Sequence, residues 1–376
     1  MIIKNGNLFC DDGVFRKNDI ETENGSIKAI GESLQSKNDD IIDAQDCYVV
    51  PGLVDIHTHG AVGADFSDGT EEAIEKISQF LLKNGVTSFL GTTMSLPEEQ
   101  LSKICKISAP IVCADKEDRA IMRGIHLEGP FFSQSKRGAQ NAEYIISPDF
   151  EMFMRLFETS KETVRIIAVA PELDGGLDFI NSASLKCKVS LGHSSTDYET
   201  ACSAFLGGAN HATHLFNGMN PFSHREPGII GAASDFDAYV ELIGDGIHIH
   251  PSMVRAVFKL FGEDRVCLIS DSMRACGLAD GQYDLGGQMV TVIGKEARVG
   301  DGALAGSVTT LTGCFRNAVK FGVPLPKALK AATINPATSV GLDNTVGSLT
   351  VGKRADILVL DKELNIKQII FGGKKI

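Results

Sequence analysis

The sequence predicts an α/β fold, namely a (β/α)8 TIM-like barrel with a small β-sandwich domain formed by the N- and C-terminal segments. Three observations support this prediction. Eight apolar, strand-like runs alternate with helical periodicity along the middle of the 376-residue chain, as in a (β/α)8 barrel. Both ends of the chain contain short stretches typical of β-strands. Residues of the metal-ligating types His, Glu and Asp stand at the ends of several apolar runs.

The eight expected strands are 53–57, 86–92, 122–128, 164–170, 188–193, 211–215, 240–246 and 266–271. Between the first two, residues 70–82 carry apolar side chains at helical spacing, and Gly85 follows the end of this expected helix. A doubly wound open sheet is the alternative arrangement. It fits less well because no glycine-rich phosphate loop follows the first strand.

The two ends of the chain are expected to form the small domain together. Asn5-Gly6 and Asn24-Gly25 are dipeptides typical of hairpin turns, and the segments 355–360 and 366–371 are typical of strands. Neither end is long enough to build a stable core alone. We therefore expect residues 1–52 and 345–376 in the β domain and 53–344 in the barrel. Within the barrel, we expect an inserted hairpin at 282–298 and helices at 308–320 and 325–333.

Composition limits the classes of function. The net charge of −12 argues against nucleic acid as the main partner. No apolar stretch approaches the roughly 20 residues of a membrane span, and the first residues lack the apolar region of a signal peptide, so a cytoplasmic location is expected. The nine cysteines form no CxxC pair, which favours reduced thiols over a disulfide framework.

The sequence His57-Thr58-His59 ends the first expected strand, where alternate side chains point the same way. Glu128, His193 and His214 end the third, fifth and sixth expected strands. In a barrel all these ends face one mouth, where active sites lie. Three protein ligands plus a water form a catalytic zinc site, which the latter three residues would supply. His57 and His59 would hold a second metal, bridged to the first by Glu128.

Asp271 ends the eighth expected strand and is a candidate general base and acid. Such a carboxylate, acting with a hydroxide formed from a metal-bound water, would catalyse hydrolysis of an amide or a related C–N bond. Asn217 and Gly218 follow the sixth strand, where small and amide residues can approach a polar ligand. Arg225 could pair with a phosphate or with a surface acid, and His248 ends the seventh strand, in the region where barrels often bind phosphate.

These motifs resemble the amidohydrolase superfamily and, within it, the deacetylases of N-acetylated amino-sugar phosphates. The matching segments are 51–60, 126–131, 192–194, 211–219, 245–248, 270–273, 304–307 and 347–356. The resemblance implies Glu128, His193 and His214 as ligands and Asp271 as the catalytic acid and base. It implies substrate contacts at Ala139, Asn217, Gly218, Arg225, His248, Leu304, Ala305, Gly306 and Ser307. It also implies a homodimer in which Arg225 reaches the neighbouring site.

Two positions distinguish this chain within the family that it resembles. Some members lack the first histidine pair and keep one metal, whereas this chain retains His57 and His59, as expected of a two-metal enzyme. Gln140 stands where some relatives carry a histidine near the substrate carbonyl, and a second metal could take over that polarising role.

The expected reaction is hydrolysis of N-acetyl-D-glucosamine 6-phosphate to glucosamine 6-phosphate and acetate. The cofactor is one or two divalent metals per subunit, with zinc favoured and iron, manganese, cobalt and nickel compatible with these ligands. A cyclic amidase or isoaspartyl dipeptidase is the alternative enzyme, although such relatives commonly bridge their metals with a modified lysine, and no lysine stands at the required strand end. A non-catalytic binding barrel is the third possibility.

Overall fold

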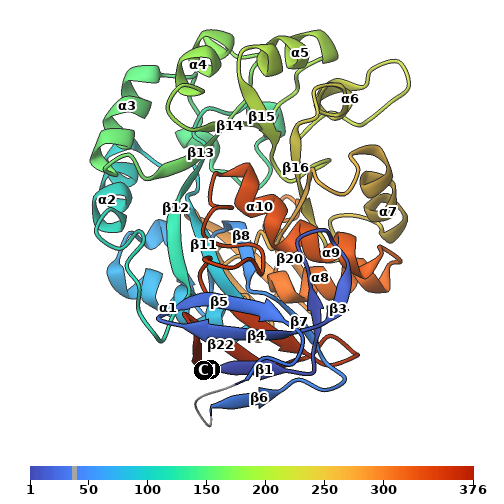
Figure 1. The fold of residues 1–376 in the computed structure, drawn as a ribbon. Helices are drawn as coiled ribbons and strands as arrows, with labels where there is room; N and C mark the ends of the chain where they lie inside the picture. The colour runs from blue at the N-terminus through green and yellow to red at the C-terminus, as the bar shows by residue number, and fades with distance from the viewer. Residues whose placement is uncertain (36–39) are drawn as a thin grey trace.

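The computed structural model describes residues 1–35 and 40–376, and its centre is an eight-stranded parallel sheet enclosed by helices (Figure 1). The strands are β8 (Leu53–Thr58), β11 (Val86–Thr92), β12 (Ile121–Glu128), β13 (Val164–Val169), β14 (Lys188–Leu191), β15 (Ala209–Ala212), β16 (Tyr239–Ile243) and β17 (Val266–Ile269). Their order in the sheet follows the chain, whereas a doubly wound sheet reverses its order. The Asp271 N–H donates to the His57 carbonyl at 3.0 Å and links the last strand to the first. The barrel prediction is confirmed.

The barrel strands are buried on both faces, which is why they appear in the sequence as nearly continuous apolar runs. All seven residues of β11 and all eight of β12 are buried. The outer helices are α1 (Glu71–Lys83), α2 (Glu98–Ser108), α3 (Phe150–Thr159), α4 (Gly176–Ala183), α5 (Tyr198–Leu206), α6 (Gly228–Asp235) and α7 (Pro251–Leu260). The first of these lies within a residue of its predicted bounds, because the Thr70 side chain accepts the Ala73 N–H and caps its start.

Several strands end earlier than the apolar pattern predicts. The expected ends at His193, Leu215, Gly246 and Asp271 lie two or three residues beyond the observed ones. The cause is local backbone conformation, because His193, His214 and Asp271 have φ values of 47°, 28° and 46°. Such left-handed residues cannot continue a strand. The chain therefore turns at the residues predicted to carry the chemistry.

The segment after β17 forms three antiparallel strands rather than a hairpin, namely β18 (Gly281–Leu285), β19 (Gln288–Ile293) and β20 (Glu296–Val299). The sequence prediction missed the second turn. The helices α8 (Leu311–Lys320), α9 (Leu325–Ala332) and α10 (Ile334–Ser339) then complete the barrel. The first two correspond to the helices expected at 308–320 and 325–333.

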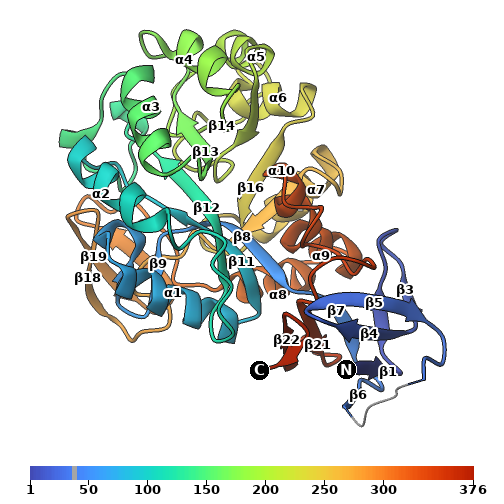
Figure 2. The same cartoon turned by 60° about the vertical axis from the view of Figure 1, so that its left-hand side comes forward.

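Strands from both ends of the chain lie together beside the barrel (Figure 2). One sheet has the order β5-β4-β1-β6 and the other β23-β22-β21-β7-β2-β3. Their bounds are β1 (Ile2–Lys4), β2 (Asn7–Phe9), β3 (Phe15–Lys17), β4 (Asp19–Glu23), β5 (Ser26–Gly31), β6 (Ile41–Asp43), β7 (Tyr48–Pro51), β21 (Ile357–Leu360), β22 (Ile366–Phe371) and β23 (Lys374–Lys375). Val49 pairs with Val359 across the two chain ends, and Ile3, Leu8 and Ile20 pack in the core that these sheets share. The domain boundaries stay a prediction, and residues 36–39 of the expected small domain lie outside the described residues.

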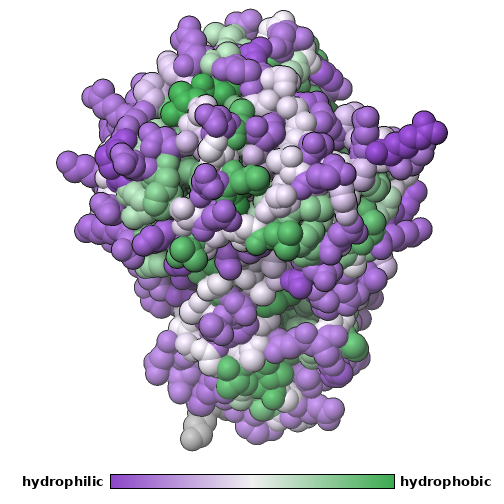
Figure 3. All heavy atoms as spheres, turned by 90° about the horizontal axis from the view of Figure 1, so that it is seen from above, coloured by the Kyte–Doolittle hydropathy of each residue, from purple (hydrophilic) through white to green (hydrophobic). Residues whose placement is uncertain are grey.

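Short elements lie in the loops that follow two barrel strands. The strands β9 (Gly60–Ala61) and β10 (Ala64–Asp65) and the 3-10 helix η1 (Phe66–Asp68) lie between β8 and α1, and the 3-10 helices η2 (Gln134–Lys136) and η3 (Ala142–Tyr144) lie between β12 and α3. On the surface seen in Figure 3, hydrophilic side chains predominate and hydrophobic ones occur in separate patches. Among the described residues, no helix has the length and apolar character needed to cross a membrane. The expected cytoplasmic location stays a prediction.

The Phe66 ring packs so closely against Gly91 of β11 that a larger residue there is expected to destabilise the fold. A Cβ added at Gly91 would lie 2.4 Å from the Phe66 ring, which is itself buried. We expect Gly91→Ala to lower the free energy of unfolding by about 1–3 kcal/mol, because a packed core cannot make room for the methyl group. Denaturant unfolding would measure this, with Gly300→Ala as the control, since no atom lies within 4 Å of a Cβ there. Equal stability of the two variants would contradict the prediction.

Candidate metal centre

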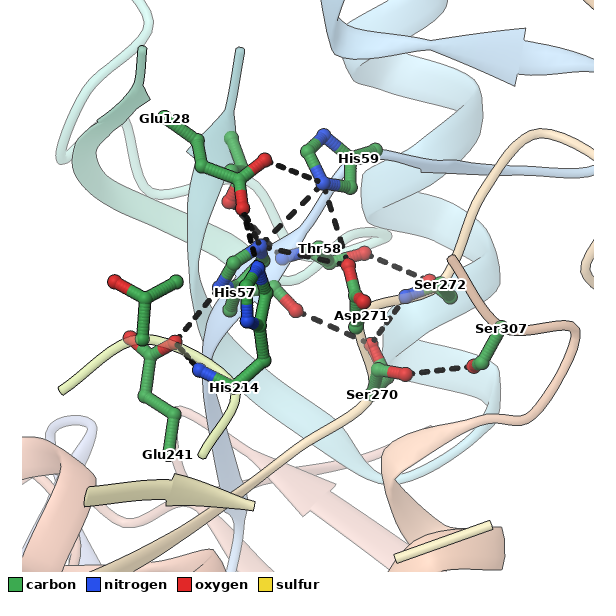
Figure 4. A network of polar contacts seen from close by, with 12 residues as sticks. His57, Thr58, His59, Glu128, His214, Glu241, Ser270, Asp271, Ser272 and Ser307 are labelled. Carbon is green, nitrogen blue, oxygen red and sulfur yellow. Dashed lines mark hydrogen bonds and ion pairs between the residues drawn. The ribbon is translucent and has the colours of Figure 1, made fainter. Parts of the chain in front are cut away.

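The six residues that the sequence singled out for metal binding and acid–base catalysis converge at the C-terminal mouth of the barrel. They are His57, His59, Glu128, His193, His214 and Asp271, and all have exposed fractions of 6% or less. Figure 4 shows five of them, with the exception of His193, pointing toward one another from different strands. Each comes from a strand end or from the turn directly after it. Histidines with separate structural roles would not be expected to converge at one site.

The first group of possible ligand atoms surrounds the histidine pair of β8. The Nε2 atoms of His57 and His59 lie 3.4 Å apart, and the Asp271 Oδ1 lies 3.4 Å from the first and 3.3 Å from the second. The Glu128 oxygens lie 3.5 Å and 3.4 Å from the same two nitrogens. Four ligands at 2.0–2.1 Å from a tetrahedral ion are separated from one another by about 3.3 Å. The group therefore fits a divalent metal ion.

The second group lies on the other side of the same carboxylate. The Glu128 Oε1 lies 3.2 Å from the His193 Nε2 and 3.0 Å from the His214 Nε2, and these two nitrogens are 3.0 Å apart. Histidine and carboxylate ligands of this kind suit zinc and several other transition metals. Glu128 belongs to both groups, as a bridging ligand would.

Hydrogen bonds on the far side of three rings determine which nitrogen faces the ligand groups. The Nδ1 of His193 contacts the Lys136 carbonyl at 2.9 Å, and that of His214 contacts the Asn217 carbonyl at 3.2 Å. The Nδ1 of His57 lies 2.8 Å from a Glu241 oxygen. An acceptor at Nδ1 places the ring proton there and leaves the Nε2 lone pair for a metal.

Burial and neighbouring opposite charges shift the pKa values of these groups in opposite directions. Burial alone would lower the pKa of His57, but Glu241, Glu128 and Asp271 together raise it to about 9. Burial would raise the pKa of Glu128, yet the surrounding histidines hold it well below its usual range. The same competition lowers the pKa of Asp271 to about 2. Both carboxylates are therefore ionised at neutral pH and available to a cation.

A cavity of about 320 Å³ opens over the two groups. It is lined by His59, Met94, Glu128, Gly138, Ala139, Gln140, His193, His214, Phe216, Asn217, Gly218, His248, Asp271, Leu285, Ala303, Leu304 and Gly306. Six of the nine residues expected to contact the substrate are among them: Ala139, Asn217, Gly218, His248, Leu304 and Gly306. The site thus brings the ligand groups and most of the expected substrate contacts to one space.

Three expected contact residues do not line the cavity. Ala305 is fully buried. The Ser307 hydroxyl donates to the Ser270 carbonyl, and its N–H donates to the Asp271 carbonyl at 2.6 Å, so this residue holds the turn that carries Asp271. Arg225 is exposed on the loop before α6.

Two polar side chains hold site residues in place through contacts that the sequence did not predict. The Gln140 side chain donates to the Glu128 Oε2 at 2.8 Å and accepts the Ser95 N–H at 2.7 Å. Its amide is thereby committed to the bridging carboxylate. Asp245 lies 2.7 Å from the His248 Nδ1 and also accepts that residue's backbone N–H, which leaves the Nε2 available to the cavity. The role of Gln140 depends on how the loops after β11 and β12 fold against each other, which no sequence period marks. Asp245 contacts a residue three positions further along the same turn, and no motif in the sequence marks that hydrogen bond.

The role of a third residue, Glu241, could have been predicted from the sequence. It is a lone carboxylate within the apolar run Tyr239–Ile243, and its side chain is fully buried. A buried charge needs a partner, so a carboxylate in the middle of a barrel strand indicates a functional polar contact. His126 and His211 are also fully buried.

Comparison with known proteins agrees with this geometry, because residues 48–376 match the model of the amidohydrolase family. The chain belongs to the amidohydrolase family. The expectation of a hydrolytic enzyme is confirmed, and the barrel with its polar strand ends is the scaffold of that family's chemistry.

The similar proteins are deacetylases of amino-sugar phosphates. An N-acetylglucosamine-6-phosphate deacetylase from Lysinibacillus sphaericus is 34% identical over 100% of this chain and 97% of its own length. An N-acetylgalactosamine-6-phosphate deacetylase from Escherichia coli O157:H7 is 35% identical over 86% of each. The structure of a mutant N-acetyl-D-glucosamine-6-phosphate deacetylase from Mycobacterium smegmatis, in complex with N-acetyl-D-glucosamine-6-phosphate, has a TM-score of 0.93 at 31% identity and covers 100% of this chain and 98% of that one. A beta-aspartyl dipeptidase structure is more distant, at 17% identity and a TM-score of 0.55, and shares the fold alone.

Proposed function

We propose that this protein hydrolyses the acetamide of N-acetyl-D-glucosamine 6-phosphate to glucosamine 6-phosphate and acetate. The observation that carries the proposal is the single cavity onto which Glu128, Asp271 and His248 all open. Ligand groups, an acid–base carboxylate and a polar substrate contact are thereby combined in one site. The end-to-end similarity to amino-sugar-phosphate deacetylases supports the choice of substrate.

The ligand set proposed for one metal is Glu128, His193 and His214, and for a second metal it is His57 and His59 with Glu128 shared. The distances between the ligand atoms support both. A divalent cation in this site would supply Lewis acidity, which lowers the pKa of a water molecule and polarises a carbonyl oxygen. Zinc suits the donor set best, because imidazole nitrogens and carboxylate oxygens form its usual catalytic sites.

In the proposed mechanism Asp271 moves the protons. It is ionised at neutral pH, so its carboxylate accepts a proton from the attacking water as the new C–O bond forms at the acetamide carbonyl. The same oxygen then gives that proton to the sugar nitrogen as the C–N bond breaks. The products are the free amine and acetic acid, which releases its proton to solvent and leaves as acetate. The left-handed turn at Asp271 aims the carboxylate into the cavity.

The phosphate of the substrate needs a cationic partner. The cavity-lining residues of the described chain include no Lys or Arg. His248 is the lining histidine outside the ligand groups. Arg225 lies exposed, away from the cavity of its own chain. We therefore propose a homodimer in which Arg225 of each subunit reaches the phosphate in the neighbouring site, where a guanidinium can form paired hydrogen bonds.

The substrate assignment is tested by comparing three sugars. We expect kcat/KM for N-acetylglucosamine 6-phosphate to exceed that for unphosphorylated N-acetylglucosamine by at least about a hundredfold, because a site built for a charged group discriminates strongly against its absence. N-acetylgalactosamine 6-phosphate, tested in parallel, shows whether the enzyme distinguishes the two sugar epimers. It is included because an N-acetylgalactosamine-6-phosphate deacetylase is 35% identical to this chain. Absence of any preference for the phosphate would favour another amidohydrolase activity.

The role of Asp271 is tested by Asp271→Asn, which retains an oxygen beside His57 and His59 but cannot accept the proton. We expect turnover to fall by about 10²–10⁴-fold, the usual contribution of a general acid–base group, while elemental analysis finds the metal content unchanged. Asp197→Asn is the matched control, since this residue caps α5 and Asn serves equally well as a cap. A near-normal rate in Asp271→Asn would rule out the proposed role.

The shared site is tested by mixing two inactive variants, Arg225→Ala and Asp271→Asn. In a mixed dimer, the subunit with an intact Asp271 receives an intact Arg225 from its partner. We expect co-expression to restore activity up to about a quarter of the wild-type value, since half of the dimers are mixed and one of their two sites is complete. Mixing Arg225→Ala with the double variant Arg225→Ala, Asp271→Asn is the control, because no subunit then provides the arginine. Failure of the first mixture to regain activity would argue against Arg225 crossing the interface.

A further inference from the structure

Glu241 is a fully buried carboxylate in the middle of β16. Burying a charged group without partners costs several kcal/mol, so its position calls for an explanation. The contacts of its side chain with His57 and with the His214 backbone supply that explanation.

One oxygen of Glu241 reaches both ligand groups of the metal centre. Its Oε2 lies 2.8 Å from the His57 Nδ1 and accepts the backbone N–H of His214 at 3.2 Å. Figure 4 shows Glu241 below these two residues, on the side away from Glu128. Glu241 thus contacts a ring from the first group and the main chain of a ligand from the second.

The distances identify Glu241 as a hydrogen-bond acceptor rather than a ligand of a third metal, although its oxygen lies near the nitrogens of His57 and His126. The contact of 2.8 Å with His57 is a normal charge-assisted hydrogen bond and is shorter than the spacing of about 3.3 Å between ligands of one tetrahedral ion. The His126 Nδ1 is 4.0 Å from the other oxygen and contacts the Ile56 carbonyl at 3.1 Å.

Two consequences follow for the ligands. The His57 ring keeps its proton on Nδ1, so its Nε2 lone pair faces Glu128 and Asp271. The His214 backbone has a φ of 28°, a conformation that non-glycine residues adopt at a cost of about 1–3 kcal/mol and that needs support from neighbouring groups. Glu241 gives that support by accepting the N–H at the turn.

We propose that Glu241 is a positioning residue that pre-organises both ligand groups, through the tautomer of His57 and the turn at His214. The inference rests on the proposed two-metal centre. It concerns a residue that touches neither the cavity nor the ions, so its effect is expected in metal affinity before it is seen in the chemical step.

The test measures metal binding directly. Glu241→Met removes the acceptor with little change of volume, and Glu241→Gln keeps an oxygen for both hydrogen bonds but removes the charge. Dissociation constants for zinc would be measured by chelator competition, and bound metal by elemental analysis. We expect Glu241→Met to weaken zinc binding at both sites, by about 10- to 100-fold at the His57 and His59 site and by less at the His193 and His214 site, where only the backbone contact is lost. Glu241→Gln is expected to fall between Glu241→Met and the wild type.

The control is Asp356→Asn, which alters another buried carboxylate, bonded to Arg354 and the Gly372 N–H away from the metal centre. A merely structural role for Glu241 would give both carboxylate variants a loss of stability with wild-type zinc affinity, and that result would overturn the proposal. If Glu241→Met does not fold, wild-type affinity at both sites in Glu241→Gln would also overturn it. A wild-type protein that binds fewer than two ions would refute the two-metal centre itself, whereas two ions in the wild type and unchanged affinity in the variants would refute the role of Glu241 alone.

Discussion

The shared Glu128 carboxylate is the constraint on which the rest of the site depends. It is almost completely buried and lies within 3.5 Å of a nitrogen from each of four histidines. A buried carboxylate is stable only with such partners, and they must come from other strands because one strand cannot surround it. A parallel barrel meets this requirement, since it directs all its C-terminal strand ends to one mouth. The Gln140 side chain donates a further hydrogen bond to the same group, at 2.8 Å.

Backbone conformation is the second requirement of this arrangement. His193, His214 and Asp271 all leave their strands through left-handed turns, which turn their side chains inward rather than along the strand. Each turn is held by hydrogen bonds to other segments: the Ser133 N–H donates to the His193 carbonyl, and the Ser307 N–H donates to that of Asp271. The strain is localised at the residues that carry the chemistry, as expected where a scaffold holds functional groups in unfavourable conformations.

The sequence predicted the barrel and the six converging residues because both depend on periodicity along the chain. Strand spacing and the position of a His or Glu at a strand end can be found without knowing any contact. The strand ends expected at His193 and Leu215 were placed too late, because apolar character continues where the backbone already turns. Ala305 and Ser307 were expected at the cavity, yet they lie behind it, since a motif does not reveal which of its residues face a ligand. Gln140 joins the loops after β11 and β12, and Asp245 holds His248 within a single turn; neither hydrogen bond follows a period that can be found in a single sequence.

Charge connects the metal centre to the proposed dimer. The chain carries a net charge of −12, and its cavity contains two ionised carboxylates, Glu128 and Asp271. A substrate with a phosphate group would be repelled from such a cavity unless cations were brought close to it. The cavity-lining part of the described chain offers histidines but no Lys or Arg. On the proposed function, divalent ions neutralise the carboxylates at one end of the substrate and Arg225 of the partner subunit neutralises the phosphate at the other. The acidic chain thus binds an acidic substrate by separating these two sources of positive charge across the length of the sugar.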